Sequence, residues 1–176
     1  MHFIKPLLLL ATTVSALTIN VPRDTARILS NLATIDRNTK SLTTTVTNWD
    51  GSLLGALGIN GAVSTLKDSI STATTNANSE TVVATSAQSQ QVIAYINNTL
   101  EPDIVKSLAA LEAKKPQFES AGLKATALQS LKDLQTGTAG LAAALKKVTS
   151  SDQLAAADAA QAKINADFNK SIASFS

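Results

Sequence analysis

The sequence contains no cysteine and a single histidine, His2. His2 lies in the N-terminal segment that we predict below to be a removed signal peptide. In the mature chain, a cysteine nucleophile, a Ser-His-Asp triad, a histidine proton shuttle and a histidine-bearing zinc site therefore lack their central residue. Disulfides are excluded as well, so packing must stabilise the fold. We predict a protein that is not an enzyme and has no cofactor or metal.

Strong charge imbalance and long hydrophobic runs are also missing. The chain has 15 basic and 13 acidic residues, without the concentrated basic face that nucleic-acid binding uses. Beyond the N-terminus, no segment offers the roughly 18 uncharged apolar residues of a transmembrane helix. We expect neither a nucleic-acid partner nor a membrane span.

The N-terminal residues MHFIKPLLLLATTVSA have the order of a secretory signal peptide. A basic start precedes a short apolar run, and small residues precede a cleavage site after Ala16. The C-terminal NADFNKSIASFS lacks the hydrophobic tail of a glycolipid-anchor signal. We expect residues 1–16 to be removed and residues 17–176 to form one secreted, extracellular domain, since that length is typical of a single domain.

Apolar residues recur at steps of three, four or seven along the chain, which indicates amphipathic helices. We expect a first helix from Asp24 as N-cap to a stop at Gly51, and a second that fades into a turn-rich linker, TTNANS. A third should run from about residue 79 to 99 with Val82 and Val83 on its apolar side. Pro102 should open a fourth. Two more should follow residues 114–117, KKPQ, which end or kink the fourth.

The predicted architecture is all-α: a single antiparallel bundle of about five to six helices. Its apolar faces use Leu, Ile, Val and Ala, and aromatics make up only 3% of the chain. Small side chains fill space poorly where helices are held apart, so the pattern leaves room for an apolar cavity.

The stretch NWDGSLLGALGINGAV, residues 48–63, combines the single tryptophan with four glycines. It lacks the GK[ST] ending of a P-loop and a preceding strand, so phosphate binding is excluded. The plain interpretation is a turn between two helices. The functional hypothesis is a mobile rim that contacts an apolar ligand, since glycines ease rearrangement. Its contact residues would be Trp49, Leu53, Leu54, Leu57 and Ile59.

Polar residues on the predicted third helix suggest a head-group site. Ser86 and Gln90 fall where an inward-facing position is expected, on the same helix as Ile93. A buried polar group needs a hydrogen-bond partner. That partner can be a backbone carbonyl or a water. Alternatively, Ser86 and Gln90 could hold the carboxylate of a fatty acid inside an apolar tunnel that Ile93 helps to line.

Two sequons and the dispersed carboxylates complete the candidates. Asn97 and Asn169 each begin an N-x-[ST] sequence, which marks a glycosylation site in an exported chain. Paired carboxylates could serve a glycoside hydrolase. The aspartates are scattered, however, and several fall at expected caps or polar faces, so we interpret them as solvated helix surface.

The chain resembles the fungal hydrophobic surface binding protein A family, which overlaps the cell wall mannoprotein and galactomannoprotein antigens. Three segments carry the resemblance: VPRDTARILSNLATIDRNTKSLTTTV, the turn NWDGSLLGALGI, and KKPQFESAGLKATALQSLKDLQTGTAGLAAALKKV. The similarity covers essentially the whole mature chain through diffuse helix-bundle patterns. It implies a secreted helical protein that binds hydrophobic surfaces or lipids such as fatty acids.

Two alternatives to lipid binding stay open. The first is a structural, antigenic cell wall mannoprotein without a specific ligand, associated with the wall and its polysaccharide. Some family members carry a Ser/Thr-rich tail and a wall anchor, whereas this chain stops soon after its last predicted helix. The second alternative is a carboxylate-dependent hydrolase.

Overall fold

The computed structural model describes residues 23–176, and its regular structure there is entirely helical. This confirms the predicted all-α class. The predicted signal peptide, residues 1–16, lies outside the described residues. The elements, in chain order, are α1 (Arg23–Asn48), α2 (Leu53–Ser79), α3 (Ser86–Tyr95), the π-helical turn η1 (Ile96–Leu100), α4 (Glu101–Ala113), α5 (Lys115–Ser120), α6 (Lys124–Lys147), the 3-10 turn η2 (Ser151–Gln153) and α7 (Leu154–Phe175).

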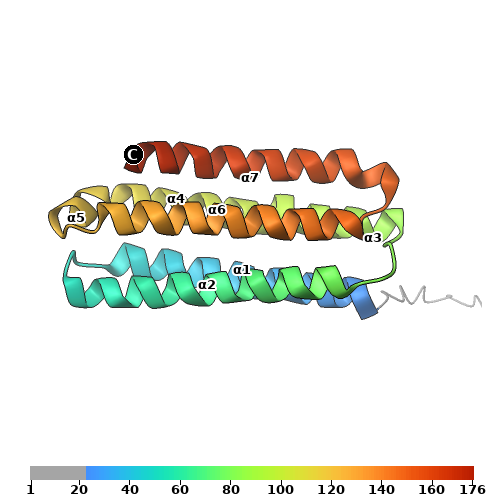
Figure 1. Ribbon diagram of the computed structural model, residues 1–176, viewed down its shortest axis with the longest axis horizontal. Coiled ribbons are helices and arrows are strands. Elements are labelled where there is room, and N and C mark those ends of the chain that lie inside the picture. The colour runs from blue at the N-terminus through green and yellow to red at the C-terminus, as the bar shows by residue number, and fades with distance from the viewer. Residues whose placement is uncertain (1–22) are drawn as a thin grey trace, which may run out of the picture.

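Five long rods run side by side along the molecule, because α3, η1 and α4 form one continuous rod (Figure 1). Rods that follow one another in the chain are antiparallel, as predicted. Contacts link the rods in the order α1, α2, α6, α7, α4 and back to α1. The rods therefore form a closed ring of five, and α5 caps one end. The inward faces of all five meet in one central core.

The connection between α1 and α2 is shorter than the four glycines of residues 48–63 indicated. α1 ends at Asn48, and only residues 49–52 form the turn, where Gly51 adopts a φ of +93°. The Ser52 hydroxyl accepts a hydrogen bond from the Gly55 N–H at 3.0 Å and caps α2. Gly55, Gly58 and Gly61 consequently lie within a helix. Asp24 lies in the first turn of α1 and is not its N-cap.

Two boundaries at the other end of the bundle were predicted wrongly. The TTNANS segment continues α2 to Ser79, because Ala73 and Ala77 are buried in the bundle and tertiary packing outweighs a weak local preference. Val82 and Val83 lie in the linker and are exposed. The third helix begins only at Ser86, after a capping box between Thr85 and Gln88.

Pro102 does not break the third rod, because a π-helical turn precedes it. The Glu101 N–H donates to the Ile96 carbonyl, five residues back. Widening the helix there accommodates a residue that has no N–H to give. Helix α4 then ends at Ala113, where the KKPQ segment breaks the rod as predicted.

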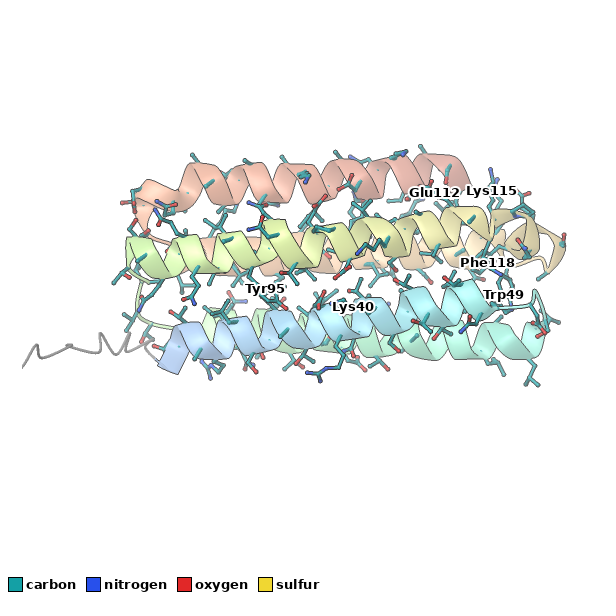
Figure 2. The ribbon with its side chains drawn as sticks, turned by 180° about the vertical axis from the view of Figure 1, so that it is seen from behind. Lys40, Trp49, Tyr95, Glu112, Lys115 and Phe118 are labelled. Atoms are coloured by element: carbon teal, nitrogen blue, oxygen red, sulfur yellow. The ribbon has the colours of Figure 1, made fainter. Side chains whose placement is uncertain are left out.

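An aromatic cluster closes the end of the bundle near α5. Trp49 and Phe118 have ring centroids 4.5 Å apart, and Phe118 lies edge-on to Phe175 at 6.0 Å. Figure 2 shows Trp49 and Phe118 meeting at this end. The Trp49 indole N–H donates to the Ser52 carbonyl at 2.8 Å. Half of the chain's aromatic residues are thus placed where the turn after α1, α5 and the end of α7 meet.

We expect Phe118→Ala to lower the free energy of unfolding by about 3–5 kcal/mol, because it leaves a void between two buried rings. Chemical denaturation followed by Trp49 fluorescence measures the loss. Leu54→Ala is the matched control: Leu54 is 79% exposed, and its loss should change the free energy by about 0.5 kcal/mol or less. Equal effects of the two changes would contradict the role of the cluster.

Candidate functional site

A narrow apolar cavity of about 90 Å³ lies inside the ring of helices. Side chains from all five rods line it. Its lining reaches from Val92 to Leu111 on the third rod, which is about 28 Å at 1.5 Å per residue. The remaining apolar lining is Leu32, Ile35, Leu42, Leu66, Ile70, Ile93, Ile96, Leu100, Ile104, Leu108, Leu134, Leu141, Ala142, Leu145, Ala157, Ala160, Ile164 and Phe168. The space is long and thin, which suits a linear apolar molecule.

A few polar groups interrupt this lining. The hydroxyls of Thr39, Thr138 and Thr149 donate to backbone carbonyls four residues earlier, at 2.8–2.9 Å. These donors are therefore already used. The other polar side chains of the lining are Ser107, Lys146 and Gln161. Lys146 is the only charged side chain of this lining.

A second, outer space of about 440 Å³ lies between the first half of α2, α5 and the first half of α6. It is lined mainly by apolar residues, and Leu53 and Leu57 on its edge are both 66% exposed. We call this space the outer groove. Leu111 and Leu134 line both the outer groove and the central cavity. These two side chains therefore stand between the two spaces.

A third hollow, of about 340 Å³, lies farther along the same α2–α6 seam. Gly137 and Gly140 of α6 form part of it, and Ile70 and Leu134 line both this hollow and the central cavity. Lys67 of α2 pairs with Asp133 of α6 at 2.7 Å. Hydrogen bonds from Lys67 and then Gln129 lower the pKa of Asp133. The α2–α6 seam is thus loosely filled and is crossed by an exposed ion pair.

The predicted apolar site residues are placed in three different surroundings. Leu53, Leu57 and Ile59 line the outer groove, and Ile93 lines the central cavity. Trp49 lines neither space. It is buried against Phe118 and anchors the turn, so the expectation that it forms part of a mobile rim is wrong.

The expectation that Ser86 and Gln90 face inward is also wrong. Gln90 is exposed, and the buried polar residue of that turn is Ser89, whose hydroxyl accepts from the Ser150 N–H at 3.0 Å. Ser86 donates to Asp152 at 2.5 Å. This hydrogen bond, together with weaker ones from Gln153 and Ser150, lowers the pKa of Asp152 to about 2. The error follows from the start of α3, which was placed seven residues too early.

Two groups of carboxylates are buried, which corrects the interpretation of the acidic residues as solvated surface. Asp36 and Asp103, from α1 and α4, share Lys40 at 2.7 and 3.1 Å. Hydrogen bonding to Lys106 lowers the pKa of Asp103, although burial opposes the shift. Glu101 of α4 pairs with Lys163 of α7 at 3.0 Å. Each carboxylate has a lysine partner, which is the arrangement of structural ion pairs.

Asp167 of α7 is the exception among these acids. Burial, followed by the nearby charge of Glu101, raises its pKa. Its Oδ2 is buried without a hydrogen-bond partner. The ionised form of Asp167 is therefore disfavoured between α4 and α7.

Other functional signals are weak in the described part of the chain. Within residues 23–176, no group of three His, Cys, Asp or Glu side chains is placed to hold a metal, and no helix there is long and apolar enough to cross a membrane. Asn97 lies in η1 and is half-buried, whereas Asn169 is exposed on α7 and accepts a hydrogen bond from Gln135. Their glycosylation stays a prediction.

Sequence reasoning missed Ser107, Lys146 and Gln161 as lining residues. Each lies in a segment that was predicted to be an amphipathic helix. A lysine beside a stripe is more often a surface residue whose stem covers apolar atoms. No feature of the sequence distinguished Lys146 from Lys147.

Fold and cavity together define the class of protein: a helix bundle built around an interior apolar space. The profile of the family "Hydrophobic surface binding protein A" matches residues 25–147. AfMp4p, crystallised in complex with palmitic acid, is 36% identical with a TM-score of 0.82, and the alignment covers 86% of this chain and 99% of that one. No curated protein sequence matches the chain. The chain belongs to the hydrophobic surface binding protein A family, which confirms the predicted resemblance.

Two more solved structures share the fold. Ligand binding domain 1 of the Penicillium marneffei MP1 protein, complexed with arachidonic acids, is 13% identical, with a TM-score of 0.81 over 88% of this chain and 99% of that one. Domain 2 of the same protein, complexed with multiple arachidonic acids, is 15% identical, with a TM-score of 0.82 over 89% and 98%. Family membership also agrees with the prediction that the protein is not an enzyme, since the family is defined by binding.

The raised pKa of Asp167 leads to a prediction for stability against pH. Below the ordinary pKa of 3.8, both folded and unfolded states are protonated and Asp167 costs nothing. As the pH rises through the window between 3.8 and the raised folded-state pKa, the unfolded state releases its proton first and stability falls. We expect Asp167→Asn to raise the Tm by a few degrees at pH 7 and to leave it unchanged at pH 3.

Thermal unfolding by circular dichroism at the two pH values measures this effect. Exposed Asp68→Asn on α2 is the control and should change the Tm at neither pH. An Asp167→Asn Tm that is lower at pH 7 would show that the ionised carboxylate is stabilising.

Proposed function

We propose that this protein binds long-chain fatty acids, or lipids of that shape, with the acyl chain in the central cavity. The observation that carries the proposal is the long apolar cavity enclosed by the five rods. The 36% identical AfMp4p crystallised with palmitic acid supports it. Burial of each CH₂ group contributes about 0.8 kcal/mol, so affinity comes mainly from removing the acyl chain from water.

The cavity must widen to accept such a ligand. Its volume of about 90 Å³ corresponds to about six water molecules at roughly 15 Å³ each, which is less than a long acyl chain needs. The α2–α6 seam is the place where the ring can open. Gly140 has open space around it, and a Cβ on Gly137 would lie 3.4 Å from the Ile70 side chain. Rotation of Leu111 and Leu134 would then join the outer groove to the cavity.

Exposed leucines at the end of the bundle support a second mode of binding, to extended apolar surfaces. Leu53, Leu54 and Leu57 are 66%, 79% and 66% exposed on the first turns of α2. They adjoin the outer groove, so an apolar surface and a free lipid would meet the protein at the same place. We call these three residues the leucine edge. Scattered single leucines need no explanation, whereas a contiguous group marks an interaction site.

We also infer that the protein acts outside the cell, on the basis of the predicted signal peptide. The predicted sequon at exposed Asn169 is compatible with that location. The alternative function, a structural cell wall mannoprotein without a ligand, predicts that the protein resists extraction from the wall. Accumulation in culture medium with copurified lipid favours the binding protein.

Filling the cavity tests fatty-acid binding directly. Ala160 of α7 is buried and lines the cavity, so Ala160→Leu should weaken palmitate binding at least tenfold, because the larger side chain occupies space that the acyl chain would fill. Competition with Nile red measures affinity, and native mass spectrometry counts bound palmitate. The neighbouring exposed Ala159→Leu is the matched control and should bind like the parent protein. Unchanged binding by Ala160→Leu, with an unchanged Tm, would place the ligand elsewhere.

The leucine edge has its own test. Replacing Leu53, Leu54 and Leu57 together by serine should reduce retention on hydrophobic beads severalfold, because three exposed apolar side chains are lost. Val82→Ser with Val83→Ser removes exposed apolar surface at the opposite end and should leave retention unchanged. Equal losses in the two variants would mean that adsorption is unspecific.

A further inference from the structure

The central cavity has a polar end, formed where α6 and α7 lie side by side. Most of its lining residues are buried, but Ala142 and Lys146 of α6, Thr149 just after it, and Ala157 and Gln161 of α7 are half-exposed. These residues lie toward the end of the bundle opposite the outer groove. The interior space therefore comes to the surface along the α6–α7 seam. The alanines leave room there for a chain to pass.

Lys146 stands at this opening with its ammonium group in reach of solvent. Its side chain is 32% exposed, and its Nζ donates to Asp158 Oδ1 at 2.9 Å. The Asp158 side chain is 62% exposed, and such a surface ion pair contributes only about 0–1 kcal/mol. A second carboxylate could thus displace Asp158 from Lys146 at little cost. Gln161 adds an amide at the same opening.

The distance from Lys146 to the far end of the cavity matches the length of an acyl chain whose carboxylate is bound at Lys146. A rise of 1.5 Å per residue places Lys146 about 18 Å from Leu134, at the far end of the cavity. One acyl chain spans about 15 Å, half of the roughly 30 Å hydrocarbon core of a bilayer. A carboxylate held at Lys146 would leave its chain to fill the apolar lining as far as Leu134.

We propose that Lys146 and Gln161 form the head-group site for the ligand's carboxylate, with the acyl chain directed inward toward Leu111 and Leu134. This inference rests on the proposed fatty-acid binding. Lys146 supplies the charge, and Gln161 supplies an amide N–H donor. This site replaces the predicted one at Ser86 and Gln90, which face away from the cavity. It makes the protein selective for anionic single-chain lipids over neutral ones of equal length.

The selectivity test compares palmitate with methyl palmitate, each in competition with Nile red. We expect Lys146→Gln to weaken palmitate binding about tenfold and to leave methyl palmitate binding unchanged, because a hydrogen bond to a charged group is lost. Lys147→Gln is the matched control: Lys147 is exposed and donates to Asn78, so both affinities should stay constant.

Substitution of Asp158, the ion-pair partner of Lys146, distinguishes ligand recognition from structural support. If Lys146 binds the ligand, Asp158→Asn removes a competing carboxylate and should strengthen palmitate binding by about two- to fivefold. If the Lys146–Asp158 pair only supports the fold, Asp158→Asn and Lys146→Gln should weaken binding alike. Weakening in both variants would overturn the proposal.

The remaining outcomes distinguish this inference from the proposed function. Parent protein that binds neither palmitate nor methyl palmitate would refute the fatty-acid function itself. In a second outcome, the parent protein binds both ligands, Lys146→Gln binds them equally well, and Ser107→Ala loses palmitate binding. That outcome would place the carboxylate deep in the cavity and overturn only the head-group assignment. Ser107 is the alternative to test because, apart from Lys146, Gln161 and the three threonines, it is the remaining polar residue of the cavity lining.

Discussion

The closed ring of five rods is the constraint on which the other features depend. Each long helix contacts two neighbours, and all five turn one face toward a common axis. Five helices around an axis are held farther from it than four would be, so side chains must span a wider centre. This chain fills that centre with aliphatic residues and places Trp49, Phe118 and Phe175 together at one end. A long, thin space remains between side chains that cannot reach one another.

The ring is held unequally around its circumference. On the side of the third rod, Asp36 and Asp103 share Lys40 across α1 and α4, and Glu101 meets Lys163 across α4 and α7. On the opposite side, the α2–α6 seam contains Gly137 and Gly140, two hollows and an exposed ion pair. Breaking a buried ion pair leaves an uncompensated charge, whereas breaking an exposed one costs little. Widening of the cavity is therefore easiest between α2 and α6.

The two ends of the cavity differ in chemistry as well. The outer groove and the leucine edge give an apolar approach at one end, and Lys146 gives a charged opening at the other. An amphiphile has the same division between tail and head group. Apolar area supplies affinity without direction, so the placement of a single charge decides how a lipid is oriented.

Local pattern alone determined the helices, the break at KKPQ, the turn near Gly51 and the aliphatic character of the core, because these depend on residue type and spacing. It failed where packing outweighed local preference: TTNANS is helical because Ala73 and Ala77 are buried, and α3 starts late because Thr85 and Gln88 form a capping box. That error assigned Ser86 and Gln90 to the wrong face, because Val82 and Val83 were used to define the apolar side of the helix although they lie outside it, whereas Ser89, Val92 and Ile93 are the buried positions. Tertiary structure alone decided which neighbours surround a residue. Successive helical residues are turned by about 100°, so Lys146 and Lys147 point in different directions. The ring order decided which of these two directions faces the cavity, and it placed Lys146 there and Lys147 in solvent.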